Sequence, residues 1–201
     1  IGQGYHSAGA IGFDGLLRIT PDGKIHLHTG VGNLGTYSYA TTSRAAAEVL
    51  KCEWDDCVIH HGNSEENLPW NSYQAGSVSI FTQTRTNYVA AMDAVDKMKR
   101  IAAETLGGVA DDYDIDGQRV YRIGSPAQGM SYGAVAARAI QLGGAYSGQT
   151  YPEDIHEITQ RSVQKLAGSG LIGVSKDNLE KTGVIPGLAC AFVEIELDLE
   201  T

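Results

Sequence analysis

Two loops of small residues, each running into a helix, most constrain what this chain can fold into. Residues 30–36 read Gly-Val-Gly-Asn-Leu-Gly-Thr, and residues 72–79 read Ser-Tyr-Gln-Ala-Gly-Ser-Val-Ser. Small side chains leave backbone N–H groups accessible, and a helix start carries partial positive charge. Together the loops predict a cradle for a large phosphorylated ligand, although either loop alone is also typical of an ordinary surface connection.

The composition places the chain among globular proteins. It has 201 residues, of which 42% are hydrophobic and 19% charged, which suits one large domain or two small ones. The net charge of −9 argues against a nucleic-acid partner, because such a surface is basic. No apolar run approaches the ~20 residues that span a bilayer, so we expect no membrane partner either.

The cysteines are few and odd in number. Cys52, Cys57 and Cys190 do not make a disulfide framework, and so sparse a set favours a reducing compartment. We therefore expect a cytoplasmic protein. An iron–sulfur site would need more cysteines nearby, so the three are interpreted as buried thiols.

Hydrophobic patterning predicts an α+β fold. Residues 16–20 and 24–28 flank Pro21-Asp22-Gly23 as a β-hairpin, with Ile25 and Leu27 on its buried face. Further strands are expected at 57–61, 119–122 and 193–199, and helices at 37–50, 82–106, 131–142 and 152–167. Hairpins mixed with helices favour a two-layer α/β sandwich with a mixed or antiparallel sheet.

Finer features of the pattern give further expectations. The long helix 82–106 is predicted to bury one face, comprising Tyr88, Met92, Val95, Ala102 and Leu106. Residues 114–117 are predicted to form a turn and residues 168–187 to be irregular. The chain begins at Ile1 and ends directly after a predicted strand, so we expect residues 1–201 to be one domain of a longer polypeptide.

A dinucleotide site is an alternative for the first loop. Gly30, Gly32 and Gly35 match the Gly-x-Gly-x-x-Gly fingerprint, and the acidic residues of 53–56 follow about twenty residues later. The first strand of such a fold is buried on both faces, whereas residues 24–28 alternate and belong to a hairpin. This context makes a nucleotide-binding domain the weaker interpretation.

The histidines raise the question of a metal. His26 and His28 are predicted on one side of a strand, and His60 and His61 lie on another strand. A metal cluster is one interpretation and plain surface histidines the commoner one, so no metal ligand is assigned. No Ser-His-Asp or Cys-His arrangement has supporting context, so no catalytic residue is assigned.

Four stretches and the end of the chain resemble a known family. Residues 75–79 read Ala-Gly-Ser-Val-Ser, residues 33–38 read Asn-Leu-Gly-Thr-Tyr-Ser ahead of Ala-Ala-Glu-Val-Leu at 46–50, and residues 61–64 read His-Gly-Asn-Ser. The chain ends in an alternating strand at 192–201. In this order they resemble the molybdenum-cofactor-binding subunit of the xanthine dehydrogenase / aldehyde oxidase family, in its molybdopterin-binding domain.

The resemblance implies a set of cofactor-binding residues. Gly35 and Thr36 would contact the pterin or its phosphate edge, although Thr36 stands where the family usually has glutamine. A second wall would come from the later loop, where Ala75 and Gly76 leave room for substrate. The implied set is Gly35, Thr36, Gln74, Ala75, Gly76, Ser77, Val78 and Ser79.

The resemblance also implies a parent enzyme. Such enzymes are molybdenum hydroxylases that oxidise an aldehyde or N-heterocycle, a small-molecule substrate, with water. Electrons leave through [2Fe-2S] clusters in an iron–sulfur subunit or domain. A flavin (FAD) subunit and a cytosine dinucleotide on the cofactor are left open.

Two departures from the family bear on activity. The family's catalytic glutamate motif, Gly-x-Gly-Glu, does not occur, so the isolated chain is expected to be inactive and to need the remainder of the molybdenum subunit. Residues 143–182 match the family poorly and are interpreted as a subfamily insertion. A cofactor-free scaffold or subunit-interface domain is the alternative.

Overall fold

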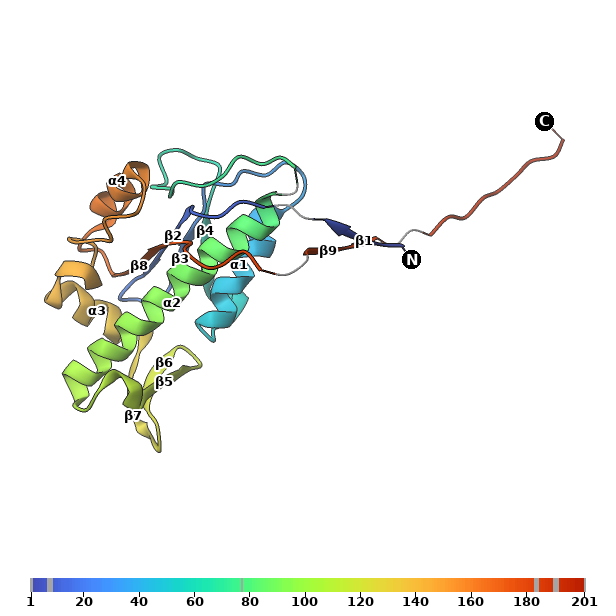
Figure 1. The fold of residues 1–201 in the computed structure, drawn as a ribbon. Helices are drawn as coiled ribbons and strands as arrows, with labels where there is room; N and C mark the ends of the chain where they lie inside the picture. Colours follow the sequence, from blue (N-terminus) through green and yellow to red (C-terminus); the bar gives the residue numbers. More distant parts are fainter. Residues whose placement is uncertain (1, 7–8, 77, 183–184, 190–191, 201) are drawn as a thin grey trace.

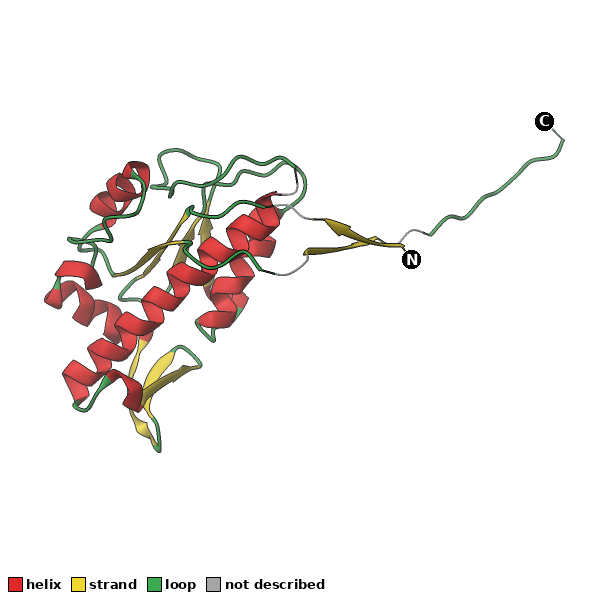
Figure 2. Cartoon of the chain, viewed as in Figure 1, coloured by secondary structure: helices red, strands yellow, loops and turns green. Residues whose placement is uncertain are grey.

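A four-stranded sheet organises the fold, with helices packed against it (Figures 1 and 2). The computed structural model describes residues 2–6, 9–76, 78–182, 185–189 and 192–200. In chain order the elements, with η for 3₁₀ turns, are β1 (Gly2–His6), β2 (Asp14–Ile19), β3 (Ile25–His28), α1 (Ser38–Val49), η1 (Trp54–Asp56), β4 (Cys57–His60), α2 (Val78–Leu106), η2 (Ala110–Asp112), β5 (Tyr113–Asp116), β6 (Arg119–Arg122), β7 (Ser125–Ser131), α3 (Tyr132–Leu142), η3 (Gly144–Tyr146), α4 (Glu157–Leu166), β8 (Leu171–Lys176) and β9 (Ile185–Ala189).

The sheet order is β4-β3-β2-β8, which confirms a mixed sheet and an α+β fold. β2 and β3 form the predicted antiparallel hairpin, with Leu17 opposite Leu27. β3 and β4 are parallel and are connected through α1. β8 runs antiparallel to β2 and places Gly173 opposite Leu17. Smaller sheets are formed by β5-β6-β7 and by β1-β9.

Two glycines let α2 lie directly on this sheet. A Cβ at Gly15 would lie 1.9 Å from the backbone oxygen of Thr86, and a Cβ at Gly173 would lie 2.5 Å from that of Ala90. Any side chain at these positions would therefore push the helix away. The main core fills this interface, where Ala90, Ala94 and Met98 are fully buried.

The predicted buried face of the long helix is wrong in part. Tyr88 and Met92 are 39% and 45% exposed, and Leu106 is also exposed, whereas Ala102 is buried and Val95 half-buried. The face that meets the sheet is lined by small residues because the helix approaches so closely. Large side chains of the predicted stripe consequently point to solvent.

The opposite face of the sheet is partly covered as well. α4 and the segment before it pack on β2 and β8 through a second cluster, formed by Leu16, Ile155, Val163, Leu166, Ile172 and Val174. Leu16 and Leu17 are therefore both buried, so β2 is covered on each face. The prediction that the other face of β3 is exposed to solvent is also wrong in part, because His28 is buried.

Strand β8 was missed by the patterning, which predicted residues 168–187 to be irregular. Leu171, Ile172, Gly173 and Val174 are buried in succession, so the strand lacks the alternation typical of a half-exposed strand. β8 lies inside residues 143–182, whose assignment as a subfamily insertion stays a prediction.

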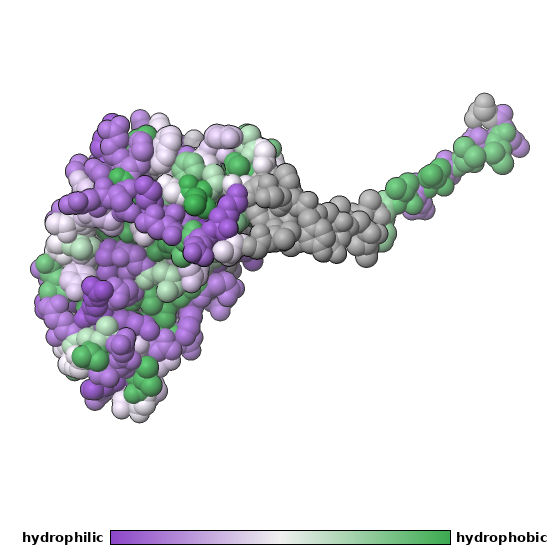
Figure 3. Space-filling model, in the orientation of Figure 1, coloured by the Kyte–Doolittle hydropathy of each residue, from purple (hydrophilic) through white to green (hydrophobic). Residues whose placement is uncertain are grey.

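Two local predictions are wrong. Residues 114–116 belong to strand β5, and the turn is Gly117-Gln118, where both residues have positive φ of 51° and 57°. Residues 192–200 form no strand, and their alternating apolar side chains are exposed on a tail that leaves the body of the fold (Figures 1 and 3). A strand needs a partner for its backbone hydrogen bonds, and no described residue pairs with this segment.

No helix in the described part of the chain has the length and apolar character to cross a membrane.

Candidate functional site

The two small-residue loops meet at the starts of α1 and α2. The Nε2 of Gln74 donates to the Oγ of Ser38 over 3.5 Å, and the hydroxyls of Ser38 and Thr36 are 2.7 Å apart. The site of a Cβ on Gly32 lies 3.7 Å from the Oε1 of Gln74. α1 packs beside part of the longer helix α2 (Figure 1). The structure thus brings Thr36 and Gln74 together through Ser38.

Each loop leaves open space at one glycine, Gly35 in the first and Gly76 in the second. Gly35 and Gly76 have φ of 83° and 52°, a region that favours glycine, and a Cβ at either would meet nothing within 4 Å. The N–H of Gly35 already donates to Asn33 Oδ1 at 2.8 Å. Gly35 therefore offers space beside its backbone rather than a free N–H donor. On the second loop Ala75 and Gly76 are exposed and likewise leave space beside the backbone.

The second loop is shorter than predicted. Val78 and Ser79 are half-buried residues of the first turn of α2, which begins four residues before the predicted start. The N–H of Val78 donates to the oxygen of Ala75 at 3.0 Å. Of the predicted second wall, Gln74, Ala75 and Gly76 lie in the loop, whereas Ser77 lies outside the described residues.

The electrostatics favour an anion. Neither loop contains Asp or Glu, and the described first turns of α1 and α2 carry no acidic residue. Unpaired N–H groups at a helix start attract negative charge and are weakened by nearby carboxylates. The site is therefore built from neutral donors and two helix starts.

Buried polar residues beneath the loops escaped the sequence analysis. The Oγ1 of Thr29 donates to Gln83 Oε1 at 3.3 Å, connecting the end of β3 to α2. The Nε2 of Gln83 and the Oγ of Ser72 are buried without a hydrogen-bond partner among the described residues. The polar positions of α2 at Thr82, Gln83, Thr86 and Asn87 are the signal that could have identified its inner face.

Asn71 fixes the start of the first loop. Its Oδ1 accepts from the N–H of Gly30, and its Nδ2 donates to the backbone oxygen of Asp14 at 2.9 Å. A Cβ on Gly30 would lie 2.8 Å from Asn71 Oδ1, so glycine permits this contact. The first loop is thereby anchored to the segment that leads into the second.

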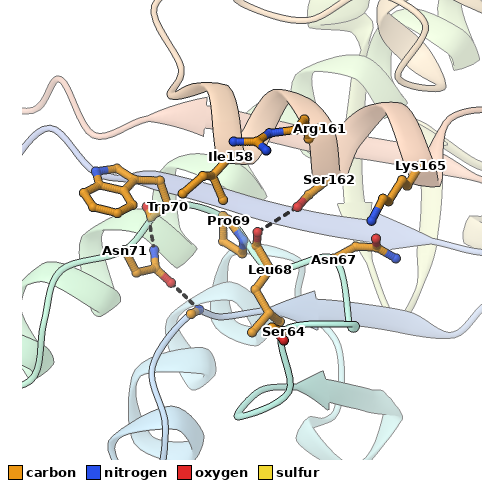
Figure 4. A pocket seen from close by; sticks show the side chains of 11 residues that line it. Ser64, Asn67, Leu68, Pro69, Trp70, Asn71, Ile158, Arg161, Ser162 and Lys165 are labelled. Carbon is orange, nitrogen blue, oxygen red and sulfur yellow. Dashed lines mark hydrogen bonds between the residues drawn. The ribbon is translucent and has the colours of Figure 1, made fainter.

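A pocket of about 500 Å³ adjoins Gly30 (Figure 4). Its wall is closed by the Ser162 hydroxyl, which donates to the Leu68 oxygen at 2.7 Å, and Arg161 and Lys165 of α4 add positive charge. The lining residues are Gly30, Ser64, Asn67, Leu68, Pro69, Trp70, Asn71, Ile158, Arg161, Ser162 and Lys165. Because they come from three distant segments, no local sequence pattern predicts this pocket.

Three of the four histidines singled out from the sequence form a hydrogen-bonded cluster with Glu66, whereas His61 stacks on Tyr39. His26 Nδ1 and His60 Nε2 share a hydrogen bond of 2.9 Å, His60 Nδ1 donates to the Glu66 carboxylate, and His28 Nδ1 donates to the Glu66 backbone oxygen at 3.0 Å. Burial, aided by neighbouring positive charge, lowers the pKa of His26 to about 4 and that of His28 to about 3. Within the described part of the chain, no three His, Cys, Asp or Glu side chains are arranged to hold a metal ion.

The geometry argues against the dinucleotide alternative. β3 and β4 are parallel, with Ile25 opposite Cys57 and His28 opposite His60. The acidic residues of 53–56 precede β4 and so lie at the opposite end of these strands from Gly30. A ribose-binding carboxylate would have to lie beside the glycine loop.

Comparison with known families shows the family of this domain. A family model described as a molybdopterin cofactor-binding domain matches residues 2–201. This chain belongs to that family. No curated protein matches the chain in a sequence search.

Solved structures share the fold of this molybdopterin-binding domain. A Cu,Mo-containing CO dehydrogenase in its carbon monoxide-reduced state aligns with a TM-score of 0.64 and 20% identity over 92% of this chain. Reconstituted CO dehydrogenase from Oligotropha carboxidovorans aligns with 0.65 and 20% over 90%, and quinoline 2-oxidoreductase from Pseudomonas putida 86 with 0.60 and 18% over 92%. The chain spans about a fifth of the length of each of these proteins, covering 22%, 21% and 22%.

The residues present fit a phosphorylated pterin group. Gly35 and Gly76 leave open space, the neighbouring side chains are neutral donors, and the buried amide of Gln83, bonded to Thr29 just before the first loop, has no partner for its Nε2 among the described residues. These are properties that a polar, anionic ligand requires of its site. The recognised family and the local chemistry therefore agree.

Proposed function

We propose that the two loops form one wall of the molybdenum–pterin site of a molybdenum hydroxylase. The contact between Gln74 and Ser38 carries this proposal, because it joins the two loops and the two helix starts into one surface. When bound, the cofactor supplies the redox chemistry. Thr36 and Gln74 donate hydrogen bonds to it, and Gly35 and Gly76 leave space for it.

The wall extends into the first turn of α2. Ser79 is half-buried there and would offer its hydroxyl, and Val78 would shape the surface beside it. Ala75 and Gly76 would leave room for a substrate next to the metal. Ser77 completes the wall in this proposal, on the strength of its resemblance to the family loop.

The parent enzyme would oxidise an aldehyde or an N-heterocycle with water as the oxygen source. The resemblance at residues 33–38 and 75–79 and the family membership support this. The catalytic base and the rest of the cradle would come from segments outside this chain. Electrons would leave through [2Fe-2S] clusters of an iron–sulfur partner. An enzyme of this kind incorporates ¹⁸O from labelled water into its product.

The decisive experiment measures molybdenum and iron in the purified complex with Gly35→Leu and Gly124→Leu. Both glycines have positive φ, 83° and 79°, and both face open space. The two substitutions therefore impose similar backbone strain, but only position 35 lies in the proposed wall. We expect Gly35→Leu to lower the molybdenum content by about tenfold, which corresponds to roughly 1.4 kcal/mol of lost binding.

Each outcome separates the alternatives. Molybdenum loss in Gly35→Leu alone, with iron retained, supports the cradle. Equal loss in both variants indicates general destabilisation and contradicts the assignment of Gly35. A wild-type complex without molybdenum, produced in cells that make the cofactor, would instead support the scaffold alternative.

A further inference from the structure

Two cysteines outside the proposed cradle lie within reach of each other. The Sγ atoms of Cys52 and Cys57 are 4.0 Å apart, and the Cys52 thiol is 3.7 Å from the oxygen of Ala47. A disulfide bond is about 2.05 Å long, so the sulfurs would have to approach by roughly 2 Å. We expect rotation of the two side chains about their Cα–Cβ bonds to supply this approach.

The backbone on each side of the pair is held in place. Cys52 follows the end of α1, and its N–H donates to the Ala47 oxygen at 3.2 Å. Cys57 is the first residue of β4, opposite Ile25 of β3, and its N–H donates to the Trp54 oxygen. Both side chains are only half-buried against the main core, so the predicted burial is wrong for this pair, and part of each thiol is accessible to small reagents; Cys190 lies outside the described residues.

The pair is chemically asymmetric. The hydrogen bond from Cys57 lowers the pKa of the Cys52 thiol, against the opposing effects of burial and the Asp56 carboxylate. The same hydrogen bond, together with burial, raises the pKa of Cys57. Because the thiolate is the nucleophile in disulfide exchange, Cys52 is the attacking thiol and Cys57 the resolving one.

We propose that Cys52 and Cys57 are a site of reversible oxidative modification, closing to an intramolecular disulfide that joins the end of α1 to the start of β4. With a small disulfide such as oxidised glutathione, the Cys52 thiolate attacks one sulfur and releases one glutathione thiolate. Cys57 then loses its proton, attacks the Cys52 sulfur and releases the second glutathione. Two protein thiols are oxidised and one glutathione disulfide is reduced to two thiols, so the exchange balances.

The test maps thiols in the purified native protein. It is incubated with oxidised glutathione or with dithiothreitol, quenched with N-ethylmaleimide and digested with trypsin. Cleavage after Lys51 and Arg85 yields one peptide, residues 52–85, that contains both cysteines. We expect the oxidised peptide to be two hydrogen masses lighter than the unlabelled reduced peptide and to carry no maleimide.

Single variants test the asymmetry. Cys57→Ser leaves no resolving thiol, so Cys52 should accumulate as the mixed disulfide with glutathione. In Cys52→Ser the Cys57 thiol stays half-buried beside the Asp56 carboxylate, which disfavours its thiolate, so its modification at pH 7 should be slower than that of Cys52 in Cys57→Ser, where the serine hydroxyl can still donate to the Cys52 sulfur. Equal rates in the two variants would overturn the assigned roles. The proposal itself fails if native wild-type protein keeps both thiols free, or carries two separate glutathiones, and closes only in urea.

Discussion

Gln74 donates its side-chain amide to the hydroxyl of Ser38 over 3.5 Å, across a separation of 36 residues. This length is at the outer limit for an N–H···O hydrogen bond, so the contact is weak. Ser38 is also 2.7 Å from the hydroxyl of Thr36, which couples three polar side chains at one corner. Because this hydrogen bond is weak, the Gln74 amide can turn toward a ligand with little loss of free energy.

Replacing Gln74 with glutamate should weaken cofactor binding. The Gln74→Glu change keeps the size of the side chain but removes a donor and places a negative charge where an anionic group is expected. We expect the molybdenum content of the complex to fall by about tenfold, the factor that 1.4 kcal/mol gives. Gln141→Glu, on an exposed position of α3, is the matched control. Equal molybdenum in both variants would contradict a role for Gln74.

Removing the Asn71 side chain should loosen the first loop. Asn71→Ala leaves the Gly30 N–H and the Asp14 oxygen without their present partner, a loss of roughly 0.5–1.5 kcal/mol for each hydrogen bond because the Gly30 end is open to solvent. We expect the Gly30 amide to exchange with solvent deuterium faster than in the wild type, while amides of β8 remain protected. Unchanged exchange at Gly30 would show that another group holds this loop.

The contact of α2 with the sheet should be intolerant of a single methyl group. In Gly15→Ala the new Cβ would lie 1.9 Å from the Thr86 oxygen, so helix and strand must separate. Overpacking of this kind costs about 3 kcal/mol. Urea unfolding of the purified chain should show that loss for Gly15→Ala, whereas Gly124→Ala, which faces open space, should lose much less. Comparable stability of the two variants would contradict the close approach.

Local patterning predicted the elements that have clear periodicity. Turn, capping and alternation rules predict the hairpin of β2 and β3, helix α1 and the Ser131 cap of α3. In that cap the Ser131 hydroxyl accepts from the Ala134 N–H at 3.2 Å. The strand β8 and the inner face of α2 could not be predicted in this way. Burial on both faces removes alternation from β8, and close packing selects small residues on α2, so each element reflects its tertiary neighbours.

The residues of the candidate site likewise include some that the sequence suggests and others that only the tertiary structure reveals. The resemblance of the two loops to a family pattern implied Gly35 and Gln74 as site residues, and that assignment stays a prediction. Ser38, Asn71 and Gln83 were missed because their importance lies in contacts with segments far away in the chain. Hydrogen bonds between distant segments are set by the tertiary fold, and a single sequence carries no periodic signal for them.

His28 should make the fold sensitive to mild acid. It is buried beside Arg18, His26 and His60, and its Nδ1–H donates to the Glu66 oxygen; burial lowers its pKa to about 3. In the unfolded chain histidine titrates near pH ~6.5, so below that pH the unfolded state binds more protons and stability falls as pH falls. Above pH ~6.5 neither state is protonated and this contribution is constant.

Between pH 7 and pH 5, His28 should lower the free energy of unfolding by about 2 kcal/mol. The value follows because pH 5 lies roughly 1.5 units below the pKa of histidine in the unfolded chain, and each unit corresponds to about 1.36 kcal/mol. His28→Asn keeps an N–H near the Nδ1 position but does not titrate in this range. Urea unfolding of both proteins at pH 7 and pH 5 should therefore show the wild type losing about 2 kcal/mol more than the variant. Equal losses would mean that His28 is protonated in the native state at pH 5, contrary to its burial.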